Sequence, residues 1–190
     1  MPKEKSAQPA YTIVKKPRVN SKREPVLQAS MRMFCHYGYH GASMAIIAAD
    51  AGVSKGIINK FFISKENLFA LCIRRFVDEI KERIDASGNR ADGDYRAHME
   101  TVFQLIKEYR PQFRLLVSTL MTPSLEEQAK NGFGADIEEL RVLLQIFDKK
   151  EKDYLEWNYT CYGMLLTYIM GGNEANYRKA SEHFFSCIGI

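Results

Sequence analysis

The chain has 190 residues, of which 46% are hydrophobic and 26% are charged, proportions that are ordinary for a soluble globular protein. It has no apolar run of membrane-spanning length, and its first residues lack the apolar core of a signal peptide. We therefore expect a cytoplasmic protein without membrane contact. The 4 cysteines follow no CxxC or Cys/His spacing, which argues against a zinc site or a disulfide framework. No metal or other cofactor is expected.

The net charge of +4 is distributed unevenly along the chain. Up to Lys65, 11 basic residues accompany 3 acidic ones, a balance of +8, whereas the remainder has 16 bases and 20 acids, a balance of −4. This asymmetry indicates that the first third of the chain meets a polyanion. A merely solvated basic tail would give the same balance, so charge alone does not decide the function.

The N-terminal third contains signals for an arm and four helices. Residues 1–20 carry Pro, Lys and Ser without any helical or strand period, and we expect a disordered basic arm. The capping-box pattern from Ser21 to Glu24 predicts the start of a first helix, which Gly38 should end. Three later serines are expected to cap two short helices and a long fourth one: Ser43, Ser54 and Ser64.

The remainder of the chain also shows helical patterns only. A turn-rich stretch at 87–94 marks a boundary. The predicted helices beyond it are 95–109, 111–121, 124–130, 135–149, 152–170 and 174–188. No segment shows sustained two-residue alternation. The predicted fold class is all-α, with a three-helix head at 21–66 and a helical bundle at 67–190.

Two of the short helices have the pattern of a helix-turn-helix. Ala48 is small enough for the two helices to cross, and Gly52 suits a left-handed turn. The small core beneath them would consist of Ile47, Val53, Ile58 and Phe62. The opposite face of the later helix is then free to enter a major groove.

The residues around this motif resemble the TetR family of regulators from Arg23 to Leu68. The matching stretches are FCHYGY at 34–39, IAADAGVSKG at 47–56 and FISKENL at 62–68. Such a run of anchors at fixed spacing is far more specific than a helix-turn-helix pattern alone. Beyond it the chain is similar to the family only in architecture.

The resemblance implies a homodimer that binds double-stranded DNA at a near-palindromic operator. It also implies a C-terminal pocket for a small-molecule effector that changes the spacing of the two heads. By motif position, Ser43 and Lys65 correspond to phosphate contacts. The positions that correspond to the reading face are Lys55, Gly56, Ile57, Asn59 and Lys60.

Specific base contacts can be assigned to this face as hypotheses. Lys60 could donate to guanine, Asn59 to adenine, and Ile57 could pack on a thymine methyl group. The family usually has tyrosine in place of Asn59, as a phosphate contact, and threonine in place of Ile57, so these two contacts are open. The arm could add minor-groove or phosphate contacts through Lys15, Lys16 and Arg18.

Large aromatic residues recur in the C-terminal part and allow two interpretations. They could simply pack a helical bundle, or some could line an apolar effector pocket. The residues we expect in the pocket wall are Phe103, Phe113, Trp157 and Tyr162. The last two helices carry apolar stripes and should form the dimer interface; alternatively, one stripe serves the subunit core.

The function predicted from the sequence is that of a ligand-responsive transcriptional regulator, a repressor rather than an activator. The alternative is a constitutive dimeric DNA-binding protein without a small-molecule ligand. An enzyme is not expected, because the chain has no phosphate-binding Gly-rich loop, no paired His and carboxylate cluster, and no nucleophile elbow.

Overall fold

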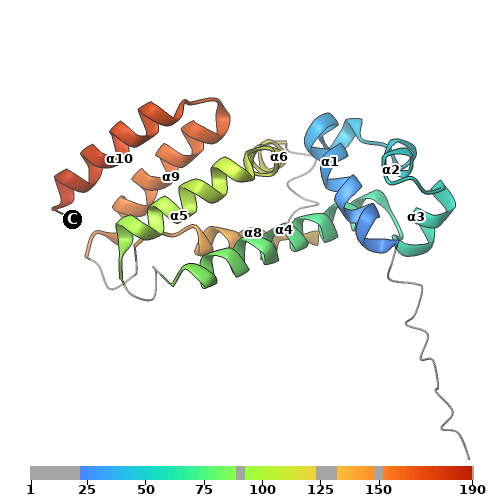
Figure 1. Cartoon of the computed structure of the whole chain (residues 1–190), viewed down its shortest axis with the longest axis horizontal. Coiled ribbons are helices and arrows are strands. Elements are labelled where there is room, and N and C mark those ends of the chain that lie inside the picture. Colours follow the sequence, from blue (N-terminus) through green and yellow to red (C-terminus); the bar gives the residue numbers. More distant parts are fainter. Residues whose placement is uncertain (1–21, 89–92, 123–131, 148–151, 190) are drawn as a thin grey trace, which may run out of the picture.

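The computed structural model describes residues 22–88, 93–122, 132–147 and 152–189. Within these ranges the chain forms nine helices and no strand, which confirms the all-α prediction (Figure 1). The helices are α1 (Arg23–Gly41), α2 (Met44–Asp50), α3 (Lys55–Phe61), α4 (Lys65–Ser87), α5 (Tyr95–Glu108), α6 (Arg110–Leu120), α8 (Gly134–Leu143), α9 (Tyr154–Met170) and α10 (Glu174–Ile188).

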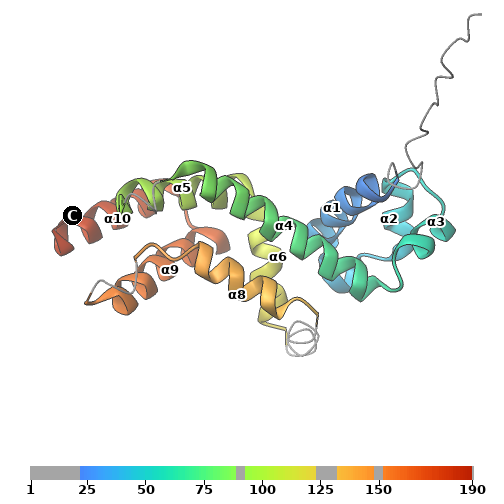
Figure 2. The ribbon, with the colours of Figure 1, turned by 90° about the horizontal axis from the view of Figure 1, so that it is seen from below.

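The helices form an elongated molecule with a small end and a larger one. Helices α1–α3, here called the head, lie at one end, while α9 and α10 lie near the other (Figures 1 and 2). Helix α4 starts beside the head. Together with α5, α6 and α8–α10 it forms the rest of the described molecule, here called the body. Contacts of α1 with α4 and α6 hold the two parts together.

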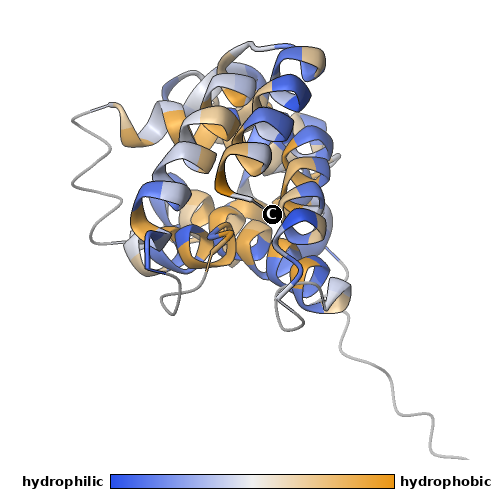
Figure 3. Ribbon diagram, turned by 90° about the vertical axis from the view of Figure 1, so that its left-hand side faces the viewer, coloured by the Kyte–Doolittle hydropathy of each residue, from blue (hydrophilic) through white to orange (hydrophobic). Residues whose placement is uncertain are grey.

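Aromatic rings connect the head to the body. The Phe34 ring of α1 meets the Phe69 ring of α4 edge-on at 4.8 Å, and Phe69 meets Phe133 at 5.4 Å. All three side chains are buried, and burying one such ring contributes about 1.5–3 kcal/mol. The end-on view in Figure 3 shows apolar residues gathered toward the spaces between helices.

The start of α1 differs from the expected capping box. The residue before the helix is Lys22, without a side-chain cap, and Ser21 lies outside the described residues. Glu24 instead accepts a hydrogen bond from Gln28 at 3.2 Å and forms an ion pair with Arg75. At its other end the helix bends at Gly38, whose φ of 69° is left-handed, and regains one turn up to Gly41.

The predicted helix 135–149 was too long. Helix α8 ends at Leu143, because the buried Asn158 side chain competes for the backbone that would continue it. Its Oδ1 accepts from the amides of Ile146 at 2.8 Å and Phe147 at 3.0 Å. Its Nδ2 donates to the carbonyls of Phe147 at 2.9 Å and Tyr154 at 2.8 Å.

The other helices that the structure describes were predicted to within about two residues at most ends. The expected arm at 1–20 and the expected helix at 124–130 lie outside the described residues. Of the helices in the described ranges, none is both long and apolar enough to cross a membrane.

Candidate nucleic-acid interface

Helices α2 and α3 form the expected helix-turn-helix. The Ser43 hydroxyl oxygen accepts from the Ile46 amide at 3.2 Å and so caps α2. The turn that follows is closed by Val53 N donating to Ala48 O at 3.0 Å, with Gly52 at a φ of 64°. This left-handed conformation is the one that glycine adopts without strain. The turn therefore fixes α3 against α2 as the motif requires.

One side of α3 is buried and the other is exposed. Ile58 is fully buried, and Phe62, which follows the helix, is 1% exposed. Ile57 of the predicted reading face is half-buried, and its four polar or small positions are exposed: Lys55, Gly56, Asn59 and Lys60. The exposed side lies at the far end of the head from the body (Figure 1). It is therefore accessible to a DNA groove.

Ser43 keeps a donor available for a phosphate. It is exposed, and its oxygen is used as the cap of α2, while its O–H can still donate. The position at a helix N-terminus favours an anion. The structure thus places Ser43 in a setting that suits the predicted phosphate contact.

Lys65, the other predicted phosphate contact, is also part of an internal network. Its Nζ donates to the carbonyl of His40 at 3.3 Å and lies 4.5 Å from the centre of the Tyr39 ring. Partial burial lowers the pKa of Lys65, and neighbouring Glu66 opposes that change. An ammonium has three donors, so one is used internally and the others can reach a phosphate.

Tyr39 is a positioning residue that the sequence did not reveal. Its buried ring lies under Lys65, and its hydroxyl donates to Glu66 at 2.8 Å. Burial, and then the bond to Glu66, raise the pKa of Tyr39, so the phenol stays protonated. Tyr39 thereby joins the end of α1 to the start of α4. Tyr39 belongs to the FCHYGY stretch that resembles the TetR family, but that resemblance did not predict the hydrogen bond to Glu66.

The charge of this surface favours a polyanion. Between Ser43 and Lys65 the only acid is Asp50, against three lysines. Asp50 is neutralised by Arg32 of α1, whose Nη2 lies 2.7 Å from its carboxylate. The helix-turn-helix therefore presents an excess of positive charge, as binding to phosphates requires.

Gly56 is not required by the packing of the head. A Cβ at this position would meet only the Ser54 Oγ, at 3.8 Å, which is ordinary van der Waals contact. Glycine lowers helix stability relative to alanine, and nothing within the described chain compensates. A residue without a side chain at this exposed position leaves room for the close approach of a binding partner such as DNA.

The four residues expected to line an effector pocket lie apart from one another. Phe103 is buried and stacks on Tyr177, with ring centres 3.9 Å apart. Phe113 packs edge-on against Phe76. Trp157 packs on Phe147, and the Tyr162 hydroxyl donates to the Arg141 carbonyl at 3.1 Å. None of the four lines the cleft of about 740 Å³ that α1, α4 and the α5–α6 corner enclose.

A family model agrees with this geometry. Residues 26–72, which cover most of α1 to the first third of α4, match the model of the bacterial regulatory proteins of the TetR family. This N-terminal segment of the chain is therefore similar to the DNA-binding part of the TetR family. The matched segment contains the helix-turn-helix and both predicted phosphate contacts.

Curated relatives are transcriptional regulators, not enzymes. The chain is 33% identical over 85 residues to the regulator BetI of Vibrio atlanticus, covering 44% of the chain and 42% of BetI. It is 30% identical over 116 residues to the activator FasR of Mycolicibacterium smegmatis, covering 58% and 53%. The alignments thus span about half the length of these relatives.

Solved structures show the same fold over most of the chain. The multidrug binding protein EbrR, complexed with imidazole, superposes with a TM-score of 0.64 at 17% identity, over 87% of this chain and 93% of that one. A candidate fatty acid metabolism regulator from Clostridium perfringens gives 0.61 at 21% identity, over 85% and 95%. At such identities the likeness establishes the fold alone.

Proposed function

We propose that this chain is a sequence-specific transcriptional regulator that acts as a homodimer on a near-palindromic operator. The observation that carries the proposal is the α3 surface, where Lys55, Asn59 and Lys60 are exposed on a positively charged helix-turn-helix. In this proposal Lys60 and Asn59 read bases, while Ser43 and Lys65 hold phosphates. The protein acts as a repressor in the cytoplasm.

The base contacts follow from the side chains that α3 exposes. A lysine ammonium can donate to the O6 and N7 of guanine, and an asparagine amide can pair with adenine. Ile57 is half-buried, and its accessible part suits contact with a thymine methyl group. The preference at each position is then set by a separate residue, which makes the contacts testable one at a time.

An exposed apolar stripe on α9 supports the homodimer. Four of its side chains are large, apolar and substantially exposed: Leu155 at 55%, Tyr159 at 69%, Leu166 at 39% and Met170 at 51%. A contiguous patch of this kind is unusual on a monomer. Tyr177 of α10, by contrast, is buried within the subunit. The contact is therefore proposed to rest mainly on α9, with the exposed Ala180 of α10 beside it.

The proposal is tested by selecting bound fragments from a random DNA pool with purified protein at physiological salt. We expect a near-palindrome whose half-sites are about one helical turn apart, as two symmetric heads require. Recovery of DNA without any shared sequence would contradict sequence-specific reading. Recovery of a single half-site would contradict the homodimer.

We further propose that a small-molecule effector in the C-terminal part weakens operator binding by preferring one head spacing. The aromatic residues of the body support a second candidate, a constitutive DNA-binding dimer, because Phe103 packs on Tyr177 rather than lining a cavity. A thermal-shift screen of small molecules separates the two. Ligands that raise the melting temperature and release DNA support the effector, and none in a broad set supports the constitutive protein.

A further inference from the structure

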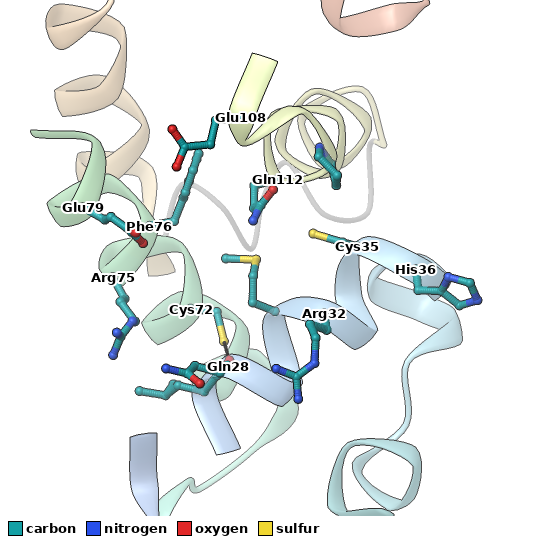
Figure 4. Close-up of a pocket in the computed structure, with 13 residues that line it drawn as sticks. Gln28, Arg32, Cys35, His36, Cys72, Arg75, Phe76, Glu79, Glu108 and Gln112 are labelled. Atoms are coloured by element: carbon teal, nitrogen blue, oxygen red, sulfur yellow. Dashed lines mark hydrogen bonds between the residues drawn. The ribbon is translucent and has the colours of Figure 1, made fainter. Parts of the chain in front are cut away.

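A cleft of about 740 Å³ lies where the head meets the body. Its walls come from α1, from α4 and from the corner between α5 and α6 (Figure 4). The volume falls within the range of roughly 300–1,000 Å³ that small-molecule sites occupy. Because both the head and the body contribute walls, a molecule bound here touches both parts at once.

One part of the cleft wall is apolar and rich in sulfur. It is formed by Leu27, Met31, Cys35, Cys72 and Phe76. Burial raises the pKa of Cys35 to about 11 and that of Cys72 to about 12, so both thiols are neutral near pH 7. Methionine adapts its shape to different apolar partners. This wall therefore suits an uncharged, apolar part of a ligand.

The charges at the rim are almost, but not fully, compensated. Three of the four charged Arg and Glu side chains have partners of opposite charge: Arg32 pairs with Asp50, Arg75 with Glu24, and Glu108 with Arg83. The fourth, Glu79, forms no ion pair within the described part of the chain. Its Oε1 accepts from the Tyr109 hydroxyl at 2.6 Å, and a phenol brings no positive charge.

Tyr109 stays neutral beside Glu79. Burial, followed by the hydrogen bond to Glu79, raises the pKa of Tyr109 to about 12. The phenol therefore remains a hydrogen-bond donor throughout the physiological range. The cleft thus carries one acidic side chain, that of Glu79, that forms no direct ion pair within the described residues.

A buried hydrogen-bond acceptor also belongs to a residue that lines this cleft. The Oε1 of Gln112 is buried and has no hydrogen-bond partner among the described residues. In Figure 4 the Gln112 side chain lies below Glu108 and extends toward the cleft, while Glu79 and Arg75 come from α4 and Arg32 from α1. Buried polar groups are normally paired, so a donor from a ligand would complete this site.

We propose that this head–body cleft binds a small organic cation with an apolar body and an N–H-bearing ammonium group. The ammonium lies near Glu79 and donates to Gln112, while the apolar body packs against Met31 and Phe76. Binding of the cation does not depend on the function proposed above. Its effect on DNA rests on that function, because a ligand held between α1 and α4 would fix one orientation of the head and so change operator affinity.

The experiment uses three probes with the same carbon skeleton: phenylbutylamine, phenylbutanol and phenylbutyrate. Binding to the full chain is measured by isothermal titration calorimetry near pH 7. We expect the amine to bind roughly tenfold more tightly than the alcohol, because the Glu79 carboxylate attracts the ammonium and not the neutral hydroxyl. The carboxylate should bind more weakly than the alcohol, since Glu79 repels it.

Variants of exposed residues localise the site without disturbing the core. Glu79→Gln keeps an acceptor for Tyr109 and should make the amine and the alcohol bind equally. Glu82→Gln, an exposed acid on α4 that does not line the cleft, should leave the preference for the amine unchanged. Gln28→Trp, at the exposed rim, should fill the cleft and lower binding of both probes. Circular dichroism checks that each variant is folded.

Equal binding of all three probes would overturn the proposal, as would an amine preference that survives in Glu79→Gln. Unchanged binding in Gln28→Trp would place the ligand elsewhere and also overturn it. Operator binding is measured separately, without probe. If the protein did not bind an operator, the proposed function would be contradicted. Whether the cleft binds the cation would still be decided by the calorimetry.

Discussion

The head and the body of this chain use their large side chains differently. In the head, α3 buries Ile58 inside and leaves Lys55 and Lys60 exposed. In the body, aromatic residues pack on one another, as Phe103 does on Tyr177. The head therefore has a surface with unused hydrogen-bonding groups and unbalanced charge, whereas the aromatic rings of the body already pack on one another.

This difference shows where a ligand can be expected to add interactions. Binding gains most where groups are exposed or unpaired before the partner arrives. The α3 surface meets this condition for DNA, and the head–body cleft meets it through Glu79 and Gln112. The stacked rings of Phe103 and Tyr177 do not meet it, although the buried Tyr177 hydroxyl has no hydrogen-bond partner among the described residues. Variants in each region can test this contrast by their separate effects on stability and on DNA binding.

The largest effect on stability is expected from Asn158→Ala in the body. It leaves the buried amides of Ile146 and Phe147 without their acceptor, at about 1–3 kcal/mol for each unsatisfied group. We expect the free energy of unfolding to fall by about 3–5 kcal/mol in a urea titration. The exposed Asn176→Ala is the matched control and should change it by less than about 0.5 kcal/mol.

The base preference of the selected operator should survive in Asn158→Ala under conditions in which the variant is folded. This outcome would confirm that the body packs without reading DNA. A changed base preference would break the distinction between the two regions. A loss of stability no larger than that of Asn176→Ala would show that the contacts of Asn158 do not hold the segment after α8.

The largest effect on DNA binding is expected from Lys60→Ala. Removal of a contact to a base edge should cost about 1–3 kcal/mol on the selected operator and relax the preference at one base position. Lys60 is exposed, so stability should remain nearly unchanged. Fluorescence anisotropy with the operator and with single-base variants of it measures both effects. Equal losses on operator and random DNA would assign Lys60 to the phosphates instead.

Lys65→Ala should weaken binding to all DNA sequences alike. Loss of one phosphate contact should reduce the slope of log affinity against log salt concentration by roughly 1. Because Lys65 also donates to the His40 carbonyl, we expect a loss of stability of up to about 1 kcal/mol. An unchanged salt slope would restrict Lys65 to its role inside the head.

The extent to which the sequence predicted the structure also differs between the regions. The caps at Ser43 and Ser64 and the turn at Gly52 were predicted because each depends on residues close in the chain. The end of α8 was not, since it depends on Asn158, which lies 11 residues beyond Phe147. The cleft was not predicted because α1, α4 and α6 meet only in the folded chain. Glu79 and Gln112 are 33 residues apart and show no shared pattern.

A smaller, pH-dependent effect is expected from Tyr39→Phe. In the folded chain the pKa of Glu66 is lowered by its own backbone amide, then by Ser64, and also by Tyr39. The ionised form of Glu66 therefore stabilises the fold above the unfolded pKa of about 4.3, and this stabilisation is lost as the pH falls through the folded pKa. Tyr39→Phe removes part of it.

Tyr39→Phe should lower the free energy of unfolding by up to about 1 kcal/mol at pH 7, a modest value because Glu66 is largely exposed. The difference from the unchanged protein should shrink as the pH falls below the unfolded pKa. Urea titrations at neutral and acidic pH measure it. Phe69→Leu, a buried neighbour that does not titrate, is the control and should give the same difference at each pH.

The smallest effect on stability, and the sharpest contrast with DNA binding, is expected from Gly56→Ala. Alanine fits the space beside Ser54 and should stabilise α3 by about 0.5 kcal/mol. If Gly56 leaves room for DNA, the same methyl group should weaken operator binding at least severalfold. Thermal unfolding and anisotropy on one preparation separate the two effects. An increase in stability with unchanged operator affinity would show that DNA does not approach α3 at Gly56.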